Sequence, residues 1–248
     1  MSKKVDILAS QVQQPRLLEL LRRFLYAQMN PEDAHHAADV PLEDCPRFFE
    51  RVNVFTSACA TYHAPSDPSG RQGMHKSRIR ATARWRTGGY RFDCVFVDRG
   101  SPEDGIAGLE VARVRLFLSF RYALKTYECA LVHWFGLLGD RPDPLTGMWM
   151  VQPEMDPVCG GPKLEIIPLQ IIERGAHLMA RFPSTPFPAR HQYYKTLSSF
   201  SSFYINNYID HHAFERIREG IVSRPSAIPV ILTHVDSHSE AIRGNLKQ

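Results

Sequence analysis

The side chains best suited to chemistry lie in a basic stretch between residues 71 and 91. This stretch contains no acidic residue, and its cations are Arg71, Lys76, Arg78, Arg80, Arg84, Arg86 and Arg91. Trp85 and Tyr90 are interleaved with them. Because arginine binds phosphate bidentately and an aromatic ring can stack on an exposed base, the stretch predicts a nucleic-acid-binding surface. The alternative is a solvated strand face whose charge is balanced by acids elsewhere.

A second group of candidate residues is aromatic. It consists of Tyr127, His133, Trp134, Phe135 and Trp149. Rings of this kind can surround a methylated ammonium group, so Tyr127, Trp134, Phe135 and Trp149 are candidates for a peptide-binding groove. Packing in a hydrophobic core explains the same residues without any ligand.

Acidic residues offer a third hypothesis, a metal-dependent nuclease. Asp93 and Asp98 lie in one strand-like run, and Asp210 and Glu215 lie in one helix-like run. Two-metal phosphoryl transfer needs carboxylates that converge on ions about 3.5–4 Å apart. Neither pair has a diagnostic spacing. We therefore expect no catalytic residue, no metal site and no cofactor.

Length and composition describe an ordinary globular chain. The 248 residues are 44% hydrophobic and 23% charged, with a formal net charge of +4. This mild excess of positive charge is compatible with an anionic partner. The five cysteines form no CxxC pair, and the first residues lack the apolar core of a secretory signal. We expect a soluble protein in a reducing, intracellular compartment.

The stretch from Gly108 to Phe135 organises the rest of the chain. Alternating and β-branched residues predict two paired strands, joined through Arg121–Lys125, although a helical reading also fits the spacing. The glycines and prolines that follow Phe135 favour the strands. Shorter strands are predicted at 51–62, 91–98, 147–153 and 163–167.

Helices are predicted on both sides of these strands. Residues 15–29 have an apolar stripe of leucines and Phe24, and residues 197–218 place Phe203, Tyr204 and His211 at helical spacing. An edge strand is predicted at 227–235. The expected fold is α+β: an antiparallel β-rich core, similar to SH3-like or bromo-adjacent-homology (BAH) small barrels, flanked by an N-terminal and a C-terminal helix. The expected divisions are 1–45, 46–220 and a tail at 221–248.

Several phrases together carry a family resemblance. They include SACATYHAPSDPSGRQGM (57–74), YRFDCVFVD (90–98), GLEVARVRLFLSF (108–120), CALVHWF (129–135) and FYINNYIDHHAFE (203–215). This series resembles the C-terminal region of proteins encoded by fungal Plavaka-type DNA transposons, which are related to the CACTA group. The likeness covers roughly residues 16–216, and Ile166–Leu169 and Met179–Arg181 depart from the family pattern.

The resemblance implies a transposon-derived protein whose nuclease core lies upstream of this region. It implies a nuclear location and a DNA or chromatin partner. Three functions follow as expectations: a non-catalytic DNA- or chromatin-binding module, a peptide-interaction module, and a remnant of a metal-dependent nuclease.

Overall fold

The computed structural model describes residues 2–33, 37–64, 67, 69, 72–86, 88–182, 190–219 and 230–233. Its centre is a hairpin of two strands, β7 (Glu110–Tyr122) and β8 (Lys125–Leu137), each 13 residues long. Tyr122 pairs with Lys125 across a two-residue turn, in which Ala123 and Leu124 have φ angles of +46° and +65°. The predicted hairpin is confirmed.

The fold is mixed α/β and rich in strands. The hairpin lies inside a large antiparallel sheet that curls into a half-barrel. One path through the sheet runs in the order β1-β2-β7-β8-β9-β13-β12, while β6 also pairs with β7, β10 with β8, and β11 with β6. The bounds are β1 Ser2–Lys4, β2 Arg51–Phe55, β6 Cys94–Val97, β9 Met150–Pro153, β10 Leu164–Pro168, β11 Ile172–Ala176, β12 Leu178–Ala180 and β13 Phe203–Ile205.

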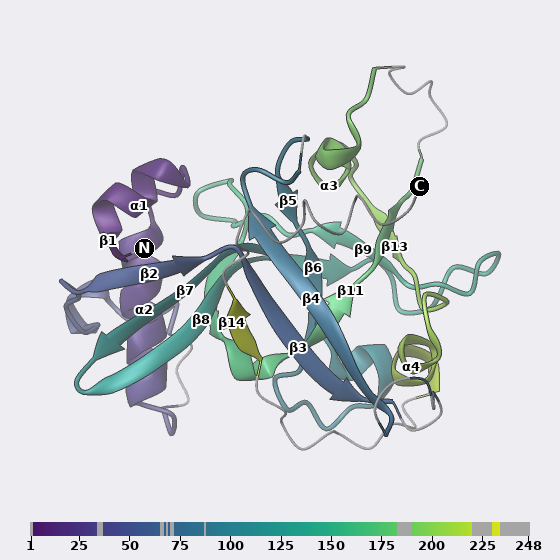
Figure 1. The fold of residues 1–248 in the computed structure, drawn as a ribbon, viewed down its shortest axis with the longest axis horizontal. Helices are drawn as coiled ribbons and strands as arrows, with labels where there is room; N and C mark the ends of the chain where they lie inside the picture. Colours follow the sequence, from purple (N-terminus) through teal and green to yellow (C-terminus); the bar gives the residue numbers. More distant parts are fainter. Residues whose placement is uncertain are drawn as a thin grey trace, which may run out of the picture.

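A smaller sheet covers one face of the hairpin. It has the order β14-β3-β4-β5, with β14 Ile231–Thr233, β3 Ser57–His63, β4 Met74–Thr82 and β5 Arg91–Phe92. In Figure 1, β3 and β4 cross in front of the large sheet. Buried residues of β3 and β4, including Ala58, Ala60 and Ile79, form one apolar cluster with Val114 and Val132 of the hairpin.

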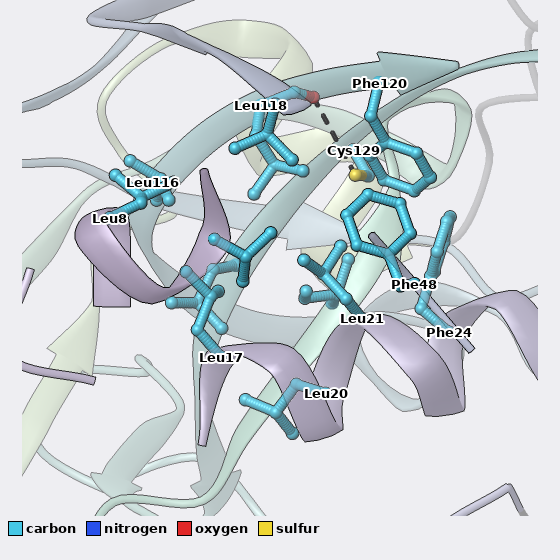
Figure 2. Packing of buried hydrophobic residues seen from close by; sticks show 14 of the residues in the cluster. Leu8, Leu17, Leu20, Leu21, Phe24, Phe48, Leu116, Leu118, Phe120 and Cys129 are labelled. Carbon is cyan, nitrogen blue, oxygen red and sulfur yellow. Dashed lines mark hydrogen bonds between the residues drawn. The ribbon is translucent and has the colours of Figure 1, made fainter. Parts of the chain in front are cut away.

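Two helices cover one end of the other face. They are α1 (Val5–Gln11) and α2 (Leu17–Met29), on the left of Figure 1. Figure 2 shows Leu17, Leu21 and Phe24 packed toward hairpin residues, among them Leu118 and Phe120. The predicted helix at 15–29 is confirmed with a start at Leu17. Because α1, α2 and the hairpin share this cluster, both helices are part of the core.

The opposite end of the same face carries a third cluster. Phe135 of β8 packs there against Phe203 and Ile205 of β13, together with Val111 of β7.

The predicted helix at 197–218 is wrong. The chain forms α3 (Thr196–Ser199), β13, α4 (His211–Phe214) and a π-helical turn at Glu215–Glu219. Pairing of β13 with β9 and β12 overrides the helical spacing.

Two predicted strands are divided between the sheets. The run 51–62 breaks at Thr56, where β2 in the large sheet gives way to β3 in the small one. The run 91–98 breaks at Asp93, whose N–H donates to Arg80 O of β4 and whose carbonyl accepts from Val114 N of β7. The described part of the predicted tail strand, β14, pairs with β3 at the sheet edge.

All five cysteines are free thiols, and Cys129 Sγ donates to Leu118 O within the cluster of Figure 2. Among the described residues, no helix has the length and apolar character needed to cross a membrane.

Removal of a buried leucine tests the packing of α2 on the hairpin. Leu21 is fully buried whereas Leu18, on the same helix, is 42% exposed. We expect Leu21→Ala to lower the free energy of unfolding by about 2–5 kcal/mol, because it leaves a cavity in the cluster. Leu18→Ala, the matched control, should change it by less than about 0.5 kcal/mol. Urea unfolding measures both, and equal effects would contradict the packing described.

Candidate nucleic-acid interface

Strand β4 separates apolar from cationic side chains by simple alternation. Ile79 and Ala81 point inward and are buried against the hairpin. Lys76, Arg78 and Arg80 occupy the alternate positions, so they lie on the outer face of the small sheet. Burial of the inner residues thereby fixes the direction of the cations.

Strand β5 extends this cationic face. Its Arg91 pairs with Thr82 in the antiparallel register, and Thr82 is two residues beyond Arg80. Arg91 therefore lies on the same face as Arg80. Its Nε donates to Asp93 Oδ1 at 2.7 Å, while Asp93 Oδ2 accepts the backbone N–H of Arg80 at 2.9 Å. One carboxylate thus fixes both strands at this point.

Three guanidinium groups lie close to the ring of Trp85. The Cζ atoms of Arg80, Arg86 and Arg91 lie 4.1, 5.3 and 5.2 Å from the centre of its ring. Such contacts are attractive because the face of the indole carries negative charge. We name Lys76, Arg78, Arg80, Arg84, Trp85, Arg86 and Arg91 together the Trp85 patch.

A tight turn presents the indole. Trp85 N–H donates to Gly89 O and Gly88 N–H donates to Trp85 O, both at 3.0 Å. A Cβ atom at Gly89 would lie 2.6 Å from the ring of Tyr194, so this position has no room for a side chain. The turn is therefore packed directly against the segment that carries Tyr194.

Most cations of the patch remain available to a partner. Lys76, Arg78, Arg84 and Arg86 are exposed. In the part of the chain that the structure describes, none of these side chains forms an ion pair. Arg71 lies outside the described residues. Lys76, Arg78, Arg80 and Arg91 therefore share the outer face of the small sheet, Arg86 lies beside Trp85, and Asp93 neutralises Arg91.

Tyr90 departs from the sequence-based expectation. It precedes Arg91 and contacts the rings of Phe92 and Tyr194, at 5.5 and 5.3 Å between ring centres. The Arg113 guanidinium lies 5.9 Å from its ring. Tyr90 therefore belongs to a second cluster and contributes no stacking surface to the Trp85 patch.

The predicted aromatic groove does not form. Tyr127 packs with α2, Trp134 lies between the two sheets, and Phe135 and Trp149 lie with β13. Trp134 is only 5% exposed. Its Nε1–H donates to Glu165 and its ring lies under Arg99, so its polar group and one ring face are already occupied. The core-packing alternative explains these residues.

The acids proposed for a nuclease include two, Asp93 and Asp98, that lie far apart. Asp93 and Asp98 are five residues apart along β6 and its flanks, a span of about 16 Å in extended chain. Asp210 accepts hydrogen bonds from Arg174, and Asp98 lies 3.6 Å from Arg216. Among the described residues, no group of His, Cys, Asp and Glu is arranged to hold a metal ion.

A buried charge network, which the sequence patterns did not indicate, holds some of these acids. Arg174, His212 and Arg216 are each at most 5% exposed. Arg174 donates to Asp210 and to Nδ1 of His212, and Arg216 donates to Glu173. Asp210 also accepts from Ala213 N at the start of α4. This network joins β11 to α4. Its carboxylates are paired with the arginines of the network.

Comparison with known protein families, curated proteins and solved structures finds no match. The geometry of the patch therefore carries the functional argument.

The network makes stability depend on pH. Burial, together with the nearby Arg174, lowers the pKa of His212 to about 4. An unfolded histidine titrates near 6.5, so between these values the unfolded chain binds more protons. We expect the free energy of unfolding to fall as the pH is lowered from 6.5 toward 4. Urea unfolding at pH 7 and pH 5 measures the loss, and NMR titration of His212 gives its pKa.

The variant His212→Gln serves as the control, because it removes the titrating group and keeps a polar side chain. It should lose less stability between pH 7 and pH 5 than the wild type does. An equal loss in both proteins would show that other groups cause the dependence.

Proposed function

We propose that the chain is a non-catalytic DNA-binding module that contacts the phosphate backbone through the Trp85 patch. The observation that carries this proposal is the common direction of its side chains. Alternation along β4 and the Thr82–Arg91 register support a single cationic face. A polyanion such as duplex DNA is the partner that a row of cations favours.

The environment of Trp85 favours phosphate contacts over base stacking. Arg80 lies only 4.1 Å from the ring centre, so one face of the indole is occupied by a guanidinium. A base could stack there only by displacing it. The indole instead restrains the side chains of Arg80, Arg86 and Arg91. They therefore lose less rotamer entropy when they bind phosphate. Backbone contacts carry no direct sequence information, so the binding is predicted to be sequence-tolerant.

The origin and setting follow the resemblance in the sequence. We propose that the chain derives from a Plavaka-type transposon protein, acts in the nucleus and has DNA or chromatin as its partner. The curled hairpin sheet is compatible with descent from an SH3-like or BAH-like barrel, which is the finer fold proposal. The patch supplies the residues that such a module needs and requires no nuclease site.

Salt dependence and mutation test the function together. Each phosphate contact releases counterions, so about four contacts predict a roughly 100-fold loss of affinity between 50 and 200 mM salt. The triple variant Arg78→Ala, Arg84→Ala, Arg86→Ala removes exposed cations without disturbing Arg80 or Arg91. We expect it to lower the slope of log K against log salt by about three. Fluorescence anisotropy with a labelled 20-base-pair duplex measures both quantities.

A variant of equal charge controls for net charge. Arg47, Arg121 and Arg141 are exposed and lie outside the patch. Replacing these three by alanine changes the total charge equally, and we expect the slope to remain near that of the wild type. Absence of binding at low salt, or equal losses in both triple variants, would contradict the proposed interface.

A further inference from the structure

A polar interruption divides the apolar face of the hairpin. Along β8, Cys129 and Leu131 belong to the cluster under α2, and Phe135 belongs to the cluster under β13. His133 occupies the position between them and pairs with Arg113 of β7. Arg115 follows at a β-bulge, where the register shifts between Val114 and Leu116. Two arginines and a histidine therefore meet where the apolar clusters end.

Both guanidinium groups contact one aromatic ring. The Cζ atoms of Arg113 and Arg115 lie 5.7 and 4.9 Å from the centre of Phe92. Arg113 is 3% exposed, and it donates to Phe92 O and to Ser198 Oγ. Arg115 is half-buried, and within the described residues it has no hydrogen-bond acceptor. Its donors are therefore available at the edge of the cluster.

Asp93 attracts Arg113 electrostatically but forms its ion pair with Arg91. Within the described chain, neither Arg113 nor Arg115 forms an ion pair, whereas the buried Arg174 and Arg216 both do. Burial lowers the pKa of both arginines, and Arg113 lowers that of Arg115 further. Burial also lowers the pKa of His133, and the two arginines add to this effect. Unpaired buried charge of this kind is unfavourable for folding and is typical of functional sites.

We propose that Arg113 and Arg115 form a binding site for a phosphate group. Arginine matches a phosphate bidentately, and two guanidiniums together balance its double negative charge. Ser198 is exposed and its hydroxyl accepts from Arg113, so it connects this arginine to the protein surface. Tyr90 borders the site, because its ring centre lies 5.9 Å from the Arg113 guanidinium, and Tyr194 contacts Tyr90. The source is either free phosphate or a nucleotide.

This site is separate from the Trp85 patch. Phe92 pairs with Ala81 on the inward side of β4, whereas Arg91 pairs with Thr82 on the outward side. Phosphate binding at Arg113 and Arg115 can therefore be tested independently of DNA binding by the Trp85 patch. A single substitution in each place distinguishes the two.

Titration of inorganic phosphate followed by NMR tests the proposal. We expect shifts at Arg113, Arg115 and His133, and a rise in the pKa of His133 when phosphate balances the arginines. The variant Arg115→Gln should weaken binding at least tenfold. Arg84→Gln, the matched control in the patch, should leave the affinity unchanged. Adenosine monophosphate, titrated in parallel, binds more tightly than phosphate if the ligand is a nucleotide and equally if it is free phosphate.

Thermal unfolding supplies a measurement that does not depend on ligand affinity. In phosphate-free buffer, Arg115→Gln should melt no lower than the wild type, because it removes an unpaired half-buried charge. Added phosphate should raise the melting temperature of the wild type and not of the variant. A lower melting temperature for the variant without phosphate would assign Arg115 a structural role. That result, equal phosphate affinity in Arg115→Gln, or the absence of any shift at Arg115 would overturn the proposal.

Discussion

Pairing of β7 with β8 is the constraint on which the rest of the structure depends. Each strand is 13 residues long, so one hairpin spans all three apolar clusters. Side chains alternate along it, and both faces must be covered. The small sheet covers one face, while α1 and α2 cover one end of the other and β13 lies at the opposite end. Loss of the hairpin would leave these elements without a common surface.

The cationic surface is a consequence of this burial. Ile79 and Ala81 are held against the hairpin by the apolar cluster between the sheets. Their neighbours Arg78 and Arg80 must then point outward, since a shift of one residue would bury the cations. Asp93 strengthens this arrangement, because it bonds to β4 and precedes the entry of the chain into the large sheet. The core of the protein thus determines what its surface presents.

Elements specified by their own hydrophobic periodicity could be predicted from the sequence. Elements set by contacts with distant parts of the chain could not. The hairpin and α2 have strong periodicity, and each lies where that periodicity placed it. The region after Leu197 has helical spacing, yet Phe203 and Ile205 pair as a strand because β9 and β12 offer partners. The changes of sheet at Thr56 and Asp93 leave no mark in the sequence pattern. The same holds for the aromatic residues, which the fold distributes among separate clusters.

Pairing with a carboxylate distinguishes the arginines that stabilise the fold from those that are candidates for binding a partner. Arg174 and Arg216 have carboxylate partners, so their charge is used within the fold. Lys76, Arg78, Arg84 and Arg86 of the Trp85 patch are exposed and form no ion pair among the described residues, which suits them to an external polyanion.

NMR mapping of a DNA complex tests the central claim most directly. On addition of a short duplex at low salt, the account predicts that amide shifts concentrate at residues 76–86 and at Arg91, while the hairpin tip at 121–125 does not respond. Shifts spread evenly over exposed cations, or centred on the hairpin tip, would contradict a DNA interface at the Trp85 patch.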